Sequence, residues 1–388
     1  MPPLRPLIVF GTRPEAIKLA PVIGECQRRR DELDPVVCLT GQHRELLRPM
    51  VDYFAIPTDI ELNCMVPGQS LAALTARCLA SLDEVCERVR PDCVVAQGDT
   101  TTAMAASLAA FYRRIPFVHV EAGLRTGDLH SPWPEEMNRR VASLAAAIHC
   151  APTCEAAANL LDEGVPDAAV HVTGNTGIDA LLQTLARERR RGQAWLEKYR
   201  YLGRRPLVLV TGHRRENLGG GIERICQAIA ALADRFGEVE FLYPVHLNPQ
   251  VMQPVHRLLA GRPNVHLCPP ASYPEFVWLM DRSKLILTDS GGIQEEAPSL
   301  RRPVLVTRDT TERPEAIAAG AAELVGTDTA VIIDRVSQLL TDPAAYAARQ
   351  PSINPFGDGH AAERIVELIA RWITSKPSAN SHQLSANS

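Results

Sequence analysis

The sequence predicts an α/β protein of two domains, each built on a mostly parallel β-sheet that helices cover on both faces. The chain has 388 residues, which is long for one domain and favours two. Short apolar runs alternate with helical patterns along nearly the whole chain. Most of these runs are continuous rather than alternating in polarity, and continuous runs are typical of parallel strands buried on both faces.

Twelve apolar runs are predicted as strands, six in each sheet. The first sheet takes residues 6–10, 35–40, 93–96, 116–120, 147–150 and 169–172. The second sheet takes residues 207–211, 239–244, 265–267, 285–288, 304–307 and 322–325. Residues 100–111 are rich in alanine and residues 222–236 carry apolar side chains at helical spacing, so both segments are predicted as helices between parallel strands.

The domain boundary is expected near Gly174, ahead of the basic stretch 187–205. The first domain then spans residues 1–173 and the second spans residues 174–358. Residues 359–374 are expected to form a helix that packs back on the first domain, and residues 375–388, rich in Ser and Asn, to be disordered. Two such sheets facing across a cleft place ligands at the carboxyl ends of their strands.

Composition excludes several classes of protein. The chain is 46% hydrophobic and 22% charged, as in ordinary globular proteins, and its net charge of −4 gives no basic surface for nucleic acid or lipid. No apolar run reaches membrane-spanning length, and the N-terminus lacks the apolar core of a signal peptide. The 10 cysteines are scattered without a CxxC pair, so we predict reduced core residues in a cytoplasmic protein and neither a zinc site nor a disulfide framework.

A nucleotide site is predicted at D-S-G-G-I-Q-E-E, residues 289–296, which follows an apolar strand and opens a helix. Ser290, Gly291 and Gly292 form a tight turn at a helix N-terminus, where N–H groups and the helix dipole favour a phosphate. Glu296, one turn further, suits the hydroxyls of a ribose. The alternative is an ordinary strand-to-helix turn.

Cations follow two of the predicted strands. Arg13 would lie at the tip of the first strand and Lys18 one helical turn later, with Pro14 at the helix start. Cations in this place suit a pyrophosphate or a phosphate leaving group, although a plain surface Arg and Lys explain the segment equally well. Arg313 follows a strand of the second sheet and can reach the nucleotide or close the cleft.

Three carboxylates, Asp99, Glu121 and Glu135, come from the first half at one predicted sheet edge. Asp99 and Glu121 leave their strands there, and Glu135 opens a helix. Clustered carboxylates can supply a general acid and a general base, or they can bind Mg²⁺. A helix-capping role is the structural alternative for Asp99.

Two histidines of the second half follow strands and would face the same cleft. His213 can carry a proton or donate to a phosphate oxygen, or it can make only a backbone hydrogen bond. His246 has the same placement and is the weaker candidate.

Eight sequence blocks stand in a fixed order along nearly the whole chain except its tail. They are G-T-R-P-E-A-I-K at 11–18, Q-G-D-T-T-T at 97–102, V-E-A-G-L-R-T at 120–126, P-W-P-E-E-M-N-R at 132–139, T-G-H-R-R-E-N at 211–217, D-S-G-G-I-Q-E-E at 289–296, T-E-R-P-E-A at 311–316 and N-P-F-G-D-G at 354–359. Together they resemble the bacterial non-hydrolysing UDP-N-acetylglucosamine 2-epimerases. Several long blocks in order are far more specific than one short motif.

The resemblance implies two Rossmann-like domains facing across a cleft, the glycosyltransferase-B-type architecture. It implies reversible C2 epimerisation of UDP-N-acetylglucosamine to UDP-N-acetylmannosamine through UDP elimination to 2-acetamidoglucal and re-addition. By likeness, the catalytic set is Asp99, Glu121, Glu135 and His213. The residues expected to bind UDP-sugar are Arg13, Lys18, Phe276, Ser290, Gly291, Gly292, Glu296 and Arg313.

The expected ligands are therefore UDP-N-acetylglucosamine and UDP, bound by a homodimer with no nucleic-acid or membrane partner and a role in cell-surface polysaccharide biosynthesis. Neither a metal nor a redox cofactor is expected, because the reaction has no net redox change and the first strand lacks a following G-x-G-x-x-G. Catalysis is expected to need closure of the two halves.

The chain departs from the family pattern at two places. Some members bind a second UDP-N-acetylglucosamine as an activator, and the possible activator site here is Gln42, Glu45 and His246. Glu45 stands where such members carry Gln, and Ala271 stands where many relatives have Gln beside the uracil.

The rival functions are a glycosyltransferase on the same fold, a hydrolysing epimerase, a UDP-sugar sensor and an epimerase of a modified UDP-acetamido sugar. A transferase needs an acceptor groove, and the aromatic content of 5% argues mildly against a large sugar platform. Hydrolysing epimerases are usually fused to a sugar kinase, for which this length leaves no room. A sensor would not need the carboxylates.

Overall fold

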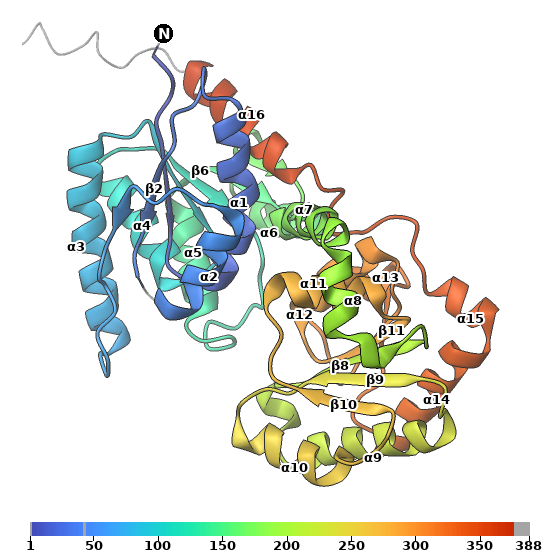
Figure 1. Ribbon diagram of the computed structural model, residues 1–388. Coiled ribbons are helices and arrows are strands. Elements are labelled where there is room, and N and C mark those ends of the chain that lie inside the picture. The colour runs from blue at the N-terminus through green and yellow to red at the C-terminus, as the bar shows by residue number, and fades with distance from the viewer. Residues whose placement is uncertain (1, 42–43, 376–388) are drawn as a thin grey trace, which may run out of the picture. The chain divides into compact units, whose positions relative to one another are not determined.

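The computed structural model describes residues 2–41 and 44–375, with all side chains except those of residues 44–46 and 373–375. The chain forms two compact units (Figure 1). Unit 1 comprises Met1–Ala180 with Gly359–Ser388, and unit 2 comprises Leu181–Asp358. The predicted disordered tail, apart from Ser375, and Gln42 of the possible activator site lie outside the described residues.

Unit 1 is built on a seven-stranded sheet in the order β3-β2-β1-β4-β5-β6-β7, with every pair of neighbours parallel. Its strands are β1 (Pro6–Phe10), β2 (Val36–Leu39), β3 (Ile60–Glu61), β4 (Cys93–Gln97), β5 (Phe117–Val120), β6 (Ala146–Ala151) and β7 (Val170–Val172). The six predicted strands are present. Strand β3 was not predicted, because its 2 residues are too few to form a recognisable apolar run.

Unit 2 is built on a six-stranded sheet in the order β10-β9-β8-β11-β12-β13, again wholly parallel. Its strands are β8 (Leu207–Thr211), β9 (Glu240–Pro244), β10 (Val265–Cys268), β11 (Leu285–Thr288), β12 (Val304–Val306) and β13 (Ala322–Leu324). The two parallel sheets confirm the predicted α/β class.

Helices and short 3₁₀ turns connect the strands (Figure 1). The helices before the second sheet are α1 (Arg13–Arg28), α2 (Arg44–Phe54), α3 (Leu71–Val89), α4 (Thr101–Tyr112), α5 (Glu135–Ala145), α6 (Cys154–Asp162), α7 (Thr176–Arg190) and α8 (Gly192–Lys198). The later helices are α9 (Gly220–Arg235), α10 (Pro249–Leu259), α11 (Tyr273–Arg282), α12 (Gly291–Glu296), α13 (Pro314–Ala318), α14 (Thr329–Thr341), α15 (Pro343–Ala348) and α16 (Ala361–Ser375). The 3₁₀ turns are η1 (Asp167–Ala169), η2 (Arg200–Leu202), η3 (Arg215–Asn217) and η4 (Ala297–Leu300).

Burial on both faces of the sheet explains the continuous apolar runs. All 5 residues of β1 are buried. Leu7 and Val9 point to one face, where they join an apolar cluster that includes side chains of α3 and α4. Ile8 and Phe10 point to the other face and are equally inaccessible to solvent. Each such side chain contributes about 1.5–3 kcal/mol when fully buried.

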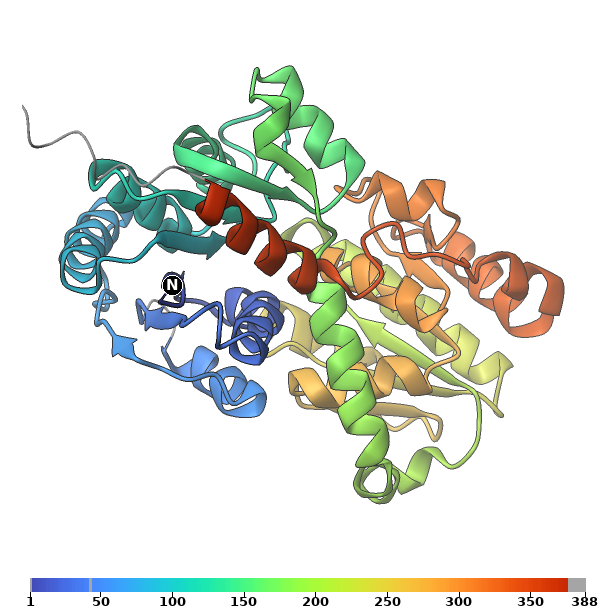
Figure 2. The same cartoon turned by 90° about the horizontal axis from the view of Figure 1, so that it is seen from above.

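The last helix, α16, packs against α1 within unit 1 (Figure 2). The backbone N–H groups of Ala361 and Ala362 donate to the buried carboxylate of Asp179 at 3.3 and 2.8 Å. Arg364 donates to the Thr173 carbonyl at 3.1 Å. Asp179 thus satisfies N–H groups that a helix N-terminus leaves without partners, and it fixes the start of α16.

Among the helices that the structure describes, none is long and apolar enough to cross a membrane. The cysteines are unpaired thiols and most of them are buried. Cys268 is half-buried and Cys154 is exposed, so the prediction of a core residue is wrong for Cys154.

Candidate active site

The carboxyl ends of β1, β4 and β5 are neighbours in the unit 1 sheet. Arg13 follows β1 closely, Asp99 follows β4 and Glu121 follows β5. Because parallel strands end at the same edge, the topology brings these three predicted site residues to one edge, where ligands bind in sheets of this kind.

Glu15 ties two of these strand ends together. Its buried carboxylate accepts hydrogen bonds from the N–H groups of Gly11 and Thr12 at 3.1 and 2.8 Å. It also accepts one from the Thr100 hydroxyl at 2.7 Å, beside Asp99. Burial raises the pKa of Glu15, and the hydrogen bonds oppose that rise. Glu15 was not among the predicted site residues, although the spacing of Thr12 and Glu15 is that of a helix capping box.

Glu121 is held by two donors on a single oxygen. Lys18 Nζ lies 2.5 Å from Glu121 Oε2, and Gln97 Nε2 donates to the same atom at 2.8 Å. The backbone of Glu121 is left-handed, with φ of 62°, which is uncommon outside glycine. The structure therefore gives Lys18 a carboxylate partner, which the sequence did not predict.

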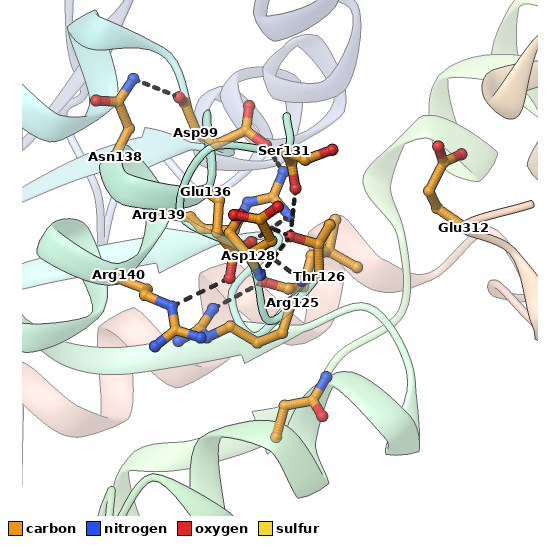
Figure 3. A network of polar contacts seen from close by, with 12 residues as sticks. Asp99, Arg125, Thr126, Asp128, Ser131, Glu136, Asn138, Arg139, Arg140 and Glu312 are labelled. Carbon is orange, nitrogen blue, oxygen red and sulfur yellow. Dashed lines mark hydrogen bonds and ion pairs between the residues drawn. The ribbon is translucent and has the colours of Figure 1, made fainter. Parts of the chain in front are cut away.

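Asp99 is held by α5 (Figure 3). Arg139 Nη2 lies 2.5 Å from Asp99 Oδ2, and Asn138 Nδ2 donates to the Asp99 main-chain oxygen at 2.9 Å. Arg139 in turn donates to Glu136 at 3.2 Å, and the Glu136 side chain has no exposed surface. The alternative of a helix-capping Asp99 is wrong, because the N-cap of α4 is Thr100.

Glu135 and Arg13 are the least constrained of the predicted residues in unit 1. Glu135 is the first residue of α5, Arg13 is the first residue of α1, and both side chains are half-buried. Neither side chain makes a hydrogen bond or ion pair with another residue that the structure describes. Both are therefore available to a ligand.

In unit 2, the buried carboxylate of Asp289 organises the loop that carries His213. Asp289 Oδ2 accepts hydrogen bonds from the N–H groups of His213 and Arg214, both at 2.9 Å, and from Asn217 at 3.2 Å. Its other oxygen, Oδ1, lies 3.5 Å from His213 Nδ1. Asp289 is part of the predicted nucleotide motif, but its contacts with the His213 loop were not predicted.

His213 lies against His246, with ring centroids 5.6 Å apart and an interplanar angle of 18°. Burial lowers the pKa of His213, Asp289 opposes the decrease, and His246 and Arg214 add to it. His246 Nδ1 accepts from the Asn248 N–H at 3.1 Å. In the activator site, only His246 has a described side chain, since Glu45 is described by its backbone alone.

The predicted phosphate turn lies between β11 and α12. Ser290 N donates to Thr288 Oγ1 at 3.0 Å, and the Ser290 side chain makes no capping hydrogen bond. A Cβ added to Gly292 would meet only Ser290 Oγ, at 4.0 Å. The surface at Gly292 is thus open to a ligand, and Glu296, half-buried, ends the same helix.

Arg313 and Phe276 are the remaining predicted site residues of unit 2. Arg313 precedes α13, and its Nε lies 2.5 Å from Glu295 Oε1. Phe276 is half-buried in the first turn of α11, which starts with a capping box of Ser272 and Glu275. Ala271, just before that helix, is half-buried.

The structure gives no support for the Mg²⁺ alternative. Within the described residues, no group of three or more His, Cys, Asp or Glu side chains could hold a metal ion. The carboxylates of Asp99 and Glu121 are paired with a guanidinium and an ammonium group instead.

Fold and site define an α/β protein of two parallel sheets, with candidate ligand-binding residues at the carboxyl ends of the strands in each unit. A family model described as UDP-N-acetylglucosamine 2-epimerase matches residues 25–370. The chain belongs to the UDP-N-acetylglucosamine 2-epimerase family.

Individual relatives are similar over nearly the full length. The probable UDP-N-acetylglucosamine 2-epimerase of Ralstonia nicotianae is 53% identical over 371 residues, 94% of this chain and 98% of the relative. The UDP-N-acetylglucosamine 2-epimerase of Escherichia coli K12 is 50% identical over the same shares of each chain. The crystal structure of the Neisseria meningitidis enzyme bound to UDP-GlcNAc has a TM-score of 0.87 and 48% identity, and covers 95% of this chain and 100% of its own.

Proposed function

We propose that this chain interconverts UDP-N-acetylglucosamine and UDP-N-acetylmannosamine by reversible epimerisation at C2. The C2 proton is removed and UDP leaves, which gives bound 2-acetamidoglucal; after reprotonation on the other face, UDP adds back. The observation that carries the proposal is the set of carboxylates at the strand ends of unit 1 in a chain of this family.

Asp99, Glu121 and Glu135 exchange protons with the sugar in this proposal. Their surroundings differ: Asp99 faces Arg139, Glu121 faces Lys18 and Gln97, and Glu135 has no partner among the described residues. Carboxylates in different electrostatic surroundings suit different proton-transfer steps. This difference supports separate roles for the three groups.

His213 acts on the leaving group. Negative charge grows on the diphosphate as UDP departs, and groups aimed at that charge lower the barrier. In this proposal the His213 ring donates a hydrogen bond to a diphosphate oxygen. Burial lowers the pKa of His213, which favours the neutral form of the ring. Arg13, Lys18 and Arg313 supply the positive charges.

UDP binds at the turn of Ser290, Gly291 and Gly292. The first turn of a helix presents N–H groups without intrahelical partners, which suit phosphate oxygens. Glu296 accepts from the ribose hydroxyls and Phe276 packs against the base. The open surface at Gly292 supports this placement.

Incubation with UDP-N-acetylglucosamine in D₂O tests the proposal. Deuterium at C2 of intact UDP-sugar, in both epimers, is the expected outcome. Release of free sugar would instead identify a hydrolysing enzyme. An absence of exchange would overturn the epimerase proposal and leave a transferase or a sensor. The same assay with modified UDP-acetamido sugars defines the substituents that the enzyme accepts.

We also propose a cytoplasmic homodimer that serves cell-surface polysaccharide biosynthesis. The structural support is an apolar area, here called the α4–α5 patch, made by Phe111 and Tyr112 of α4, which are 61% and 64% exposed, beside Ala145 at the end of α5. Phe111 and Tyr112 also line a pocket with Ala145 and Trp372. Exposed apolar surface of this kind marks contact sites between proteins. Binding of an activator at Gln42, Glu45 and His246 stays a prediction.

A further inference from the structure

Two consecutive residues of α5 hold Asp99 from different directions (Figure 3). Asn138 donates to the main-chain oxygen at 2.9 Å, and Arg139 contacts the carboxylate Oδ2 at 2.5 Å. The other carboxylate oxygen, Oδ1, accepts no hydrogen bond from any residue that the structure describes. The Asp99 side chain is 28% exposed, so one oxygen is fixed and the other is open.

The guanidinium of Arg139 also pairs with a second carboxylate, that of Glu136. Its side chain is 11% exposed, and its Nη1 lies 3.2 Å from Oε2 of the fully buried Glu136. Glu136 also accepts from the Thr126 N–H at 3.1 Å and from Arg140 Nε at 3.0 Å. Arg139 therefore bridges a buried carboxylate and a partly exposed one.

We propose that Arg139 is a positioning residue for the epimerisation: it fixes Oδ2 of Asp99 so that Oδ1 is presented to the sugar, without touching substrate itself. The proposal rests on the catalytic role proposed above for Asp99. A planar guanidinium constrains a carboxylate far more than a flexible ammonium does. Misplacement of a reacting group by about 1 Å can cost about 100-fold in rate.

The competing explanation is that Arg139 only stabilises the fold through Glu136. Arg140 provides the matched control, because it pairs with the same Glu136 at 3.0 Å and, among the described residues, its one other carboxylate partner is Glu163, at 3.8 Å. A purely structural role predicts similar effects of Arg139→Gln and Arg140→Gln. A positioning role predicts that the effects on turnover differ.

The experiment measures kcat and KM for epimerisation with both variants, together with thermal stability and UDP binding. We expect Arg139→Gln to lower kcat about 100-fold with KM within about threefold of wild type. Arg139→Lys should recover part of that loss, because it keeps the charge but not the planar fork. Arg140→Gln should keep kcat near wild type while losing comparable thermal stability.

A double-mutant cycle with Asp99 completes the test. Once Asp99→Asn has removed the carboxylate, adding Arg139→Gln should reduce kcat no further, because groups that act as one unit are not additive. Multiplicative losses, or equal losses of kcat in Arg139→Gln and Arg140→Gln, would overturn the positioning role. If Arg139→Gln does not fold, Arg139→Lys takes its place in the same cycle.

Failure of the underlying proposals gives different results. A wild-type chain without C2 exchange contradicts the epimerase function, and full activity in Asp99→Asn contradicts the catalytic role of that carboxylate. A third outcome is distinct from both. If the wild type is an epimerase and Asp99 is needed for turnover, but the losses from Asp99→Asn and Arg139→Gln are independent, only the positioning role is contradicted.

Discussion

A carboxylate and its amide are nearly equal in size, so amide variants remove proton transfer without opening a cavity. We expect Asp99→Asn, Glu121→Gln and Glu135→Gln each to lower turnover by about 100-fold or more, the usual scale for general acid–base groups. Binding of UDP, measured by calorimetry, should be spared. Near-normal turnover in all three variants would mean that the carboxylates serve the fold alone.

His213 should behave differently from the carboxylates, because its proposed partner is the departing diphosphate. An interaction that strengthens only as charge develops affects turnover more than ground-state binding. We therefore expect His213→Asn to lose chiefly kcat, and to convert added 2-acetamidoglucal and UDP back to UDP-sugar poorly. Unchanged kcat with weakened substrate binding would assign His213 to ground-state recognition instead.

Gly292 tests the nucleotide site, because a larger side chain there meets open space rather than protein. Gly292→Val should fold and yet block the approach of a phosphate. UDP at about 100 times its Kd should stabilise the wild type by about 2.7 kcal/mol, a gain that the variant should lose. Gly237→Val is the control, since Gly237 also faces open space and lies outside the proposed site. Unchanged UDP affinity in a folded Gly292→Val protein would contradict the proposed UDP site at this turn.

At the scale of elements, β5 and β6 place two buried histidines side by side. His119 and His149 are partners in the strand register, and each ring leaves Nδ1 without a hydrogen-bond partner among the described residues. Burial is the main cause that lowers the pKa of each to about 4, from an ordinary value of 6.5. Both side chains are therefore neutral in the folded protein at neutral pH.

Because both histidines are buried and neutral, we expect the folded protein to lose stability as the pH falls. Between about pH 6.5 and pH 4 the unfolded chain binds protons that the folded chain rejects, so stability falls as pH falls. Each histidine should cost about 2 kcal/mol of unfolding free energy between about pH 6.5 and pH 5. Urea unfolding at both pH values measures this loss of unfolding free energy. His119→Gln should lose less than the wild type between the two pH values. The control His256→Gln, which replaces an exposed histidine, should lose as much as the wild type. Equal losses in both variants would contradict the assignment.

At the scale of the whole molecule, the α4–α5 patch predicts self-association. Replacing Phe111 and Tyr112 together by Ser should shift the protein from dimer to monomer in sedimentation equilibrium, because both side chains are more than half exposed in the single chain. The control is Leu247→Ser, which removes a 69% exposed apolar side chain from unit 2 and should leave the dimer intact. A dimer that survives the double substitution must use another surface.

The sequence predicted the strands well because double-sided burial leaves a continuous apolar run. It also placed Asp99 and Glu121 at one edge, since parallel strands end together. The partners of the site residues could not be predicted in the same way. Arg139 contacts Asp99 from 40 residues away, and Asp289 binds the loop of His213 across 76 residues. Such contacts depend on how each helix packs and on side-chain direction, which no local pattern records.

Helix α5 begins with Glu135, and Asn138 and Arg139, which contact Asp99, follow only one turn later. A helix is stiff over so short a span, since its turns are closed by hydrogen bonds. Any tilt of α5 therefore moves Glu135 and, at the same time, changes the contacts that Asn138 and Arg139 make with Asp99. A substitution that shifts the packing of α5 on α4 is therefore expected to displace both carboxylates together.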